Sequence, residues 1–151
     1  MDETQDRLSA MALTTFALNG LFLAVAEELA APAGLTAARW QVLGAVLKEP
    51  LTQSEIARRM GITRQSVRRT SLQLVEEGML HFISNPSSRK AMLLQLTDKG
   101  YAAVHKISPQ HAAFAKLLEE RVGKDQMVKI LDAMTALRDT LEAMVLPEEE
   151  L

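Results

Sequence analysis

The chain has 151 residues, enough for one domain or two small lobes with a substantial buried core. It contains no cysteine, which excludes disulfides, thiolate metal sites and thiol redox sensors. The formal net charge is only −2, and few aromatic residues beside abundant Ala, Leu and Met favour a soluble, mainly helical protein.

The first predicted element is a long helix from about Glu3 to Ala31, which Pro32 and Gly34 end. Its apolar residues recur at a spacing of three to four but occupy more than one side, so the helix needs more than one neighbour. We expect it to pack partly on the chain's own core and partly on a second copy. The N-terminus is acidic, unlike a signal peptide, and the apolar run around residues 18–26 is too short to span a bilayer. A cytoplasmic protein without a membrane segment is therefore predicted.

A second helix is predicted from Thr36, as its N-cap, to about Lys48. Arg39 and Gln41 are expected to face outward, and Pro50 stops the helix. The side chains expected to face inward are Trp40, Leu43, Val46 and Leu47.

Two short helices joined by a glycine turn are predicted between residues 52 and 78. Thr52 and Glu55 have the spacing of a capping box, and Gly61 can adopt the positive φ that ends a helix. Thr63 is placed to cap the second helix. The apolar side of that helix is formed by Val67, Ser71, Leu74 and Val75. This pattern is a helix-turn-helix whose second helix has a basic free face.

The segment after Gly78 predicts an antiparallel hairpin. Apolar runs at residues 79–84 and 91–96 flank the turn-rich segment 85–90, which should form a long tip. A basic hairpin behind a helix-turn-helix is a wing. Between residues 52 and 90, seven basic and three acidic residues give +4, which leaves −6 for the rest of the chain. Such an asymmetry fits an anion-binding face or, alternatively, an ordinary solvated surface.

Two further helices complete the prediction. Thr97 and Asp98 cap a long helix that Pro109 should bend or break, and Gly123 separates it from a last helix with apolar residues at helical spacing. Because the terminal helices have more apolar surface than the core can cover, we expect a two-fold dimer; a monomer with a larger bundle is the alternative. The predicted fold is mainly α with a small β-hairpin wing: a winged helix-turn-helix at 35–97, and a helical dimerisation region at 1–34 and 98–151.

The order of these elements and several short motifs resemble the multiple-antibiotic-resistance regulator (MarR) family of winged-helix transcription factors. The motifs that carry the resemblance are residues 35–43, 51–57, 61–63, 74–80, 85–86 and 96–100. The resemblance implies a sequence-specific regulator of double-stranded DNA, a ligand-responsive repressor that acts as a homodimer on a pseudo-palindromic operator. The sequence itself does not distinguish repression from activation.

The wing departs from the family pattern, which has Asp, any residue, then Arg at the tip. Here the three positions are Ser88, Arg89 and Lys90. Lys lacks the planar fork of Arg, which favours a less ordered wing and weaker minor-groove discrimination unless Arg89 takes over. Leu72 also stands where the family often has an acidic residue.

In a helix-turn-helix, the N-terminal part of the second helix enters the major groove. Arg64, Gln65 and Arg68 are candidates for base readout, because Arg can pair with guanine and Gln with adenine through two hydrogen bonds. Arg89 and Lys90 would lie in the adjacent minor groove. Residues suited to phosphate contacts are Thr52, Gln53, Ser54, Thr63, Ser66 and Arg69. The alternative is that these arginines only keep a helix soluble.

The resemblance also implies a crevice for a small, often anionic aromatic effector between the dimerisation helices and the winged helix. Its candidate lining residues are Phe16, Asn19, Phe22, Trp40 and His105, each of which could equally be an ordinary core or solvated residue. Three scattered histidines do not predict a metal site, and no catalytic motif or cofactor is expected. The competing function is a winged-helix module for protein interaction, or a dimeric scaffold, with little DNA affinity.

Overall fold

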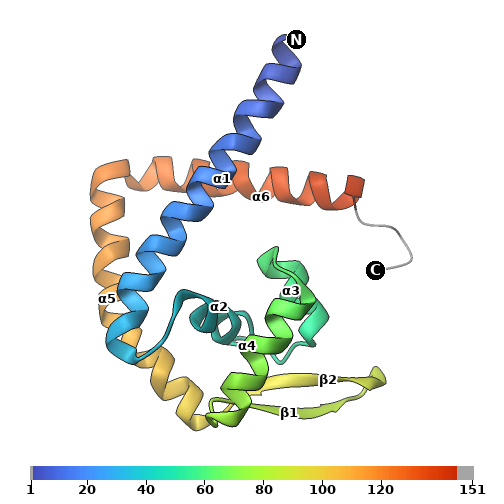
Figure 1. The fold of residues 1–151 in the computed structure, drawn as a ribbon. Coiled ribbons are helices and arrows are strands. Elements are labelled where there is room, and N and C mark those ends of the chain that lie inside the picture. Colours follow the sequence, from blue (N-terminus) through green and yellow to red (C-terminus); the bar gives the residue numbers. More distant parts are fainter. Residues whose placement is uncertain (1, 146–151) are drawn as a thin grey trace. The chain divides into compact units, whose positions relative to one another are not determined.

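The computed structural model describes residues 2–145. Its elements are α1 (Glu3–Ala30), a 3-10 turn η1 (Ala31–Ala33), α2 (Ala37–Ala45), α3 (Gln53–Met60), α4 (Arg64–Glu76), β1 (Leu80–Asn85), β2 (Ser88–Leu96), α5 (Asp98–Val122) and α6 (Lys124–Val145). The predicted mainly α fold with a hairpin wing is confirmed, and Figure 1 shows α2, α3 and α4 gathered beside the hairpin. The chain divides into two compact units, 1–109 and 110–151. The predicted division into DNA-binding and dimerisation regions concerns function and stays a prediction.

Threonine side chains start three of the helices, as the sequence predicts. Thr36, Thr52 and Thr63 each accept a hydrogen bond from the backbone N–H three residues later. Gly61 ends α3 with φ 64°, a left-handed conformation that suits glycine. The helix-turn-helix is therefore built by short-range rules that the sequence contains.

Helix α2 is shorter than predicted. It ends at Ala45, because Val46 leaves helical geometry with φ −102° and ψ 11°, and Leu47 is exposed rather than buried. Arg39, expected to face outward, is only partly exposed. Arg39 Nη1 donates to Glu77 Oε2 over 2.7 Å, and Lys99 Nζ donates to the Glu77 backbone oxygen over 2.7 Å. These contacts join α2, the end of α4 and the start of α5.

The hairpin β1–β2 is called the wing from here on. Its strands are antiparallel, with Leu80 opposite Leu96 and Phe82 opposite Leu94. Leu94 also exchanges two backbone hydrogen bonds with Leu51, which attaches the segment before α3 to the wing. The predicted long tip is wrong, because pairing extends to Asn85 and Ser88 and leaves only residues 86 and 87 between the strands. Arg89 and Lys90 consequently lie on β2.

Helix α5 begins against the base of the wing. Thr97 Oγ1 accepts from the N–H of Gly100, and a Cβ added to Gly100 would lie 2.2 Å from the Met79 backbone oxygen. Only glycine allows this approach. Of the two outcomes predicted for Pro109, a break of the helix is wrong, because α5 continues through this residue. A bend stays a prediction.

The core lies in the winged helix and the segments that border it. Its buried residues outside the winged helix are Ala30 of α1 and Gly100, Ala103 and Ile107 of α5. Leu29 and Val104 pack against the core partly buried, and none of the described residues of α6 is buried. The buried apolar residues of the winged helix itself are Leu35, Ala37, Val42, Leu43, Val46, Leu51, Ile56, Ala57, Val67, Leu74, Leu80, Leu94 and Leu96.

The apolar segment of α1 is longer than the sequence patterns predicted. The segment Glu3–Ala33 contains an 18-residue window with mean hydropathy 1.8, so by length and composition alone it is long enough to span a membrane. Helices that pack inside soluble proteins pass the same test, so this finding by itself carries little weight. The expectation that no segment is long enough was wrong.

Candidate nucleic-acid interface

Helix α4 has a buried face and a basic exposed face. Val67, Thr70, Ser71 and Leu74 are buried against the rest of the winged helix. Arg64, Gln65, Arg68 and Arg69 are exposed on the surface. Within residues 2–145, none of these arginines forms an ion pair shorter than 4.0 Å. Their guanidinium groups are therefore accessible, which fits both alternatives that the charge pattern leaves open, an anion-binding face and a solvated surface.

The first turn of α3 places three predicted phosphate contacts in different surroundings. Thr52 is buried, and its Oγ1 already accepts from the N–H of Glu55. The Gln53 amide is half-buried and donates to Ser71, whereas Ser54 is exposed. Ser54 is thus the side chain of this turn that is most accessible to a ligand.

The tip of the wing is held by side-chain hydrogen bonds to the backbone. Asn85 donates through Nδ2 to the Ala91 oxygen and accepts through Oδ1 from the N–H of Ser87, over 2.9 and 3.0 Å. Ser88 Oγ accepts from the N–H groups of Lys90 and Ala91, both over 3.3 Å. The hydroxyl of Ser88 therefore supplies acceptors for the turn, although it offers Lys90 no charged partner.

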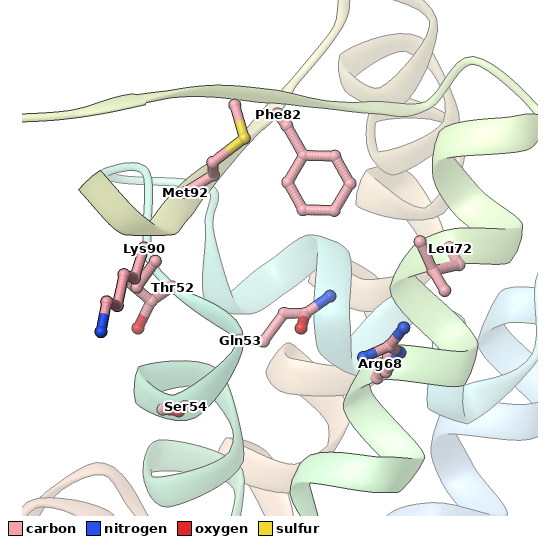
Figure 2. Close-up of a pocket in the computed structure, with 9 residues that line it drawn as sticks. Thr52, Gln53, Ser54, Arg68, Leu72, Phe82, Lys90 and Met92 are labelled. Atoms are coloured by element: carbon pink, nitrogen blue, oxygen red, sulfur yellow. The ribbon is translucent and has the colours of Figure 1, made fainter. Parts of the chain in front are cut away.

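A cavity of about 370 Å³ lies between α3, α4 and the wing. Its lining comprises Thr52, Gln53, Ser54, Arg68, Leu72, Phe82, Lys90, Ala91 and Met92. Figure 2 shows Gln53 near the centre, with Arg68 and Leu72 on α4 to one side and Lys90 on the other. Five of the predicted DNA-binding residues, from three separate elements, therefore meet at one site.

Sequence reasoning missed the apolar part of this lining, which is Leu72, Phe82, Ala91 and Met92. The only sequence signal was Leu72, an apolar residue beside the basic face of α4, where an acidic one was expected. Thr63, Arg64, Gln65, Ser66 and Arg69 do not line the cavity. Thr63, Arg64, Gln65 and Ser66 lie at the N-terminal end of α4, where Thr63 Oγ1 accepts from the N–H of Ser66. Arg69 follows Arg68 towards the middle of the helix.

The residues predicted to line an effector crevice have mixed environments. Phe16 is 70% exposed, Phe22, Asn19 and His105 are also exposed, and Trp40 is partly buried against the core. None of the five lines the cavity beside the wing. Their role in ligand binding stays a prediction.

Comparison with known proteins identifies the architecture. Residues 33–91 match the model of the MarR family. An uncharacterized protein of Mycobacterium tuberculosis is 34% identical over 93% of both chains, and an HTH-type transcriptional regulator of Bacillus cereus is 31% identical over 76% of this chain and 78% of its own. The transcriptional regulator MosR of M. tuberculosis, solved in complex with DNA, has the same fold, with a TM-score of 0.71 and 23% identity over 89% of this chain and 98% of its own.

Proposed function

Because this chain belongs to the MarR family of winged-helix transcriptional regulators, we propose that it is a homodimer that binds double-stranded DNA sequence-specifically. In this proposal it is a cytoplasmic, ligand-responsive repressor rather than an enzyme. Helix α4 enters the major groove, where Arg64, Gln65 and Arg68 contact base edges. Arg89 and Lys90 follow in the adjacent minor groove.

The exposed arginines of α4 are the observation that carries this proposal. Arg39 has an acidic partner in Glu77, and Arg59 has one in Glu49. Arg64, Arg68 and Arg69 have none among the residues that the structure describes. These exposed cations on α4, with Lys90 across the cavity, provide the complement of a phosphate backbone.

The homodimer is supported by the apolar surface of the terminal helices. Leu13, Phe16 and Leu21 of α1 are exposed, as are Leu131 and Met134 of α6. A monomer rarely presents so much apolar surface to water, and an identical copy related by a two-fold axis would cover it. Two α4 helices on such a dimer imply half-sites about 10 bp apart, centre to centre.

The proposal is tested by selecting bound fragments from the source genome and titrating the best of them at several salt concentrations. We expect affinity to fall steeply as salt rises, because Lys and Arg side chains release counterions from DNA. Arg68→Ala should weaken operator binding by about 1–3 kcal/mol. Arg7→Ala is the matched control, since Arg7 is exposed on α1 and paired with Glu3.

Two outcomes would contradict this function. Negligible DNA affinity even at low salt would favour the protein-interaction or scaffold module. Equal binding by Arg68→Ala and the wild-type protein would remove Arg68 from the interface. The same titration, repeated with a library of phenolic acids, tests the effector: DNA release supports it, and a flat response together with unchanged thermal stability excludes those compounds.

A further inference from the structure

A hydrogen-bonded chain joins the first residue of α3 to the middle of α4. Gln53 Nε2 donates to Ser71 Oγ over 3.1 Å, and Ser71 Oγ donates to the Arg68 backbone oxygen over 3.1 Å. Ser71 is 0% exposed, so water cannot replace either partner without the helices separating. The hydroxyl thus has both an acceptor and a donor role within the protein.

These bonds differ in kind from the other contacts between the two helices. Ile56 and Ala57 of α3, with Val67 and Leu74 of α4, belong to one apolar core, and apolar contact is non-directional. Such contact tolerates a small rotation or slide of one helix on the other. A hydrogen bond depends on distance and angle, so the Gln53–Ser71 pair favours a particular rotation of α4 about its own axis.

That rotation controls where the arginines point. Ser71 lies one helical turn beyond Arg68, and its hydroxyl contacts the Arg68 carbonyl group itself. In Figure 2 the Gln53 side chain extends from α3 towards α4, the helix that carries Arg68. A base-edge contact requires correct placement of the guanidinium group, whereas a phosphate contact is less demanding.

We infer that Gln53 is a positioning residue, which acts through Ser71 to orient Arg68 for base readout, and not mainly a phosphate contact. This inference rests on the proposed DNA-binding function. It revises the expectation for Gln53, because one of the two N–H donors of its amide group is engaged with Ser71. It also gives the buried hydroxyl of Ser71, which an apolar core does not require, a role in sequence specificity.

The test compares affinities for the selected operator and for an unrelated duplex of equal length. Loss of a phosphate contact lowers both affinities alike, whereas misplacement of Arg68 lowers the operator affinity alone. For Gln53→Ala we expect operator affinity about tenfold lower, with unrelated-DNA affinity changed less than about twofold. Ser54→Ala, in the same turn of α3, is the matched comparison and should lower both affinities to the same extent.

Double variants establish whether Gln53→Ala lowers operator affinity through Ser71 and Arg68. In the Ser71→Ala or the Arg68→Ala background, Gln53→Ala should cause little further loss, because residues that act as one unit are non-additive. If Gln53→Ala unfolds below the assay temperature, Gln53→Met replaces it in the test. Methionine has a side chain of similar length but cannot donate the hydrogen bond to Ser71. Equal loss on both duplexes, or full additivity in both backgrounds, would overturn the inference. A wild-type protein that binds no DNA would instead overturn the proposed function.

Discussion

The winged helix and the terminal helices bury their apolar residues to different extents. The winged helix buries a continuous core within a single chain, from Leu35 to Leu96. Helix α1 has one buried residue, Ala30, and no described residue of α6 is buried. The winged helix therefore has a complete core in one chain, whereas α1 and α6 present exposed apolar residues that the proposed second copy would cover.

Because of this difference, substitutions in the two regions should affect different properties of the protein. Changes within the winged helix should reduce its stability or its DNA contacts, and they should leave assembly intact. Changes on the exposed apolar faces of α1 and α6 should affect assembly and barely affect the folding of the winged helix. The predictions below test this separation, beginning with the largest expected effect.

The first prediction concerns Leu131 and Met134, which are 60% and 45% exposed on α6. The double substitution Leu131→Glu with Met134→Glu should dissociate the proposed dimer, because an unpaired charge buried at an interface costs about 3–5 kcal/mol. Sedimentation equilibrium measures the loss, and operator binding should fall with it. Lys129→Glu, an exposed polar position on the same helix, is the control and should remain dimeric. A double variant that sediments as the wild-type protein does would place the interface elsewhere.

The second prediction concerns Gly100 at the start of α5. A Cβ there would lie 2.2 Å from the Met79 backbone oxygen and 2.8 Å from Leu96 Cδ2, and a backbone atom cannot move aside as a side chain can. Gly100→Ala should therefore destabilise the protein by about 3 kcal/mol. Denaturant unfolding at fixed protein concentration measures this change.

Gly44 in α2 is the matched control. A Cβ at Gly44 would meet nothing within 4 Å, so Gly44→Ala should be neutral or stabilise the protein by about 0.5–1 kcal/mol. If both variants unfold at the same denaturant concentration, the close approach of α5 to Met79 does not limit stability. Dimerisation of folded Gly100→Ala should be unchanged, in contrast to the α6 variant.

The sequence predicts best the features that depend on neighbouring residues. Caps by Thr36, Thr52 and Thr63, and the glycine turn at Gly61, follow from local hydrogen bonds and backbone conformation. The missed features join distant segments. Glu77 lies 38 residues from Arg39, and Ser71 lies 18 residues from Gln53, so neither pair has a periodic signature. The short wing tip was missed for a related reason, since strand pairing carries further towards a turn than composition indicates.

The smallest effect is expected at the tip of the wing, where Ser88 and Lys90 lie outside the buried core and depart from the family pattern. Ser88→Asp keeps acceptor oxygens for the N–H groups of Lys90 and Ala91, and Lys90→Arg adds the planar fork that a narrow minor groove favours. Together they should tighten binding by about 1 kcal/mol on operators with A·T-rich flanks, and not on G·C-rich ones. Fluorescence anisotropy on both duplexes measures the difference, with Lys90→Arg alone as the control. Equal gains on both flanks would mean that the wing contact is strengthened by a general electrostatic effect and not by groove shape. Folding and dimerisation should be unchanged in both variants, because the wing substitutions do not alter the exposed apolar face of α6.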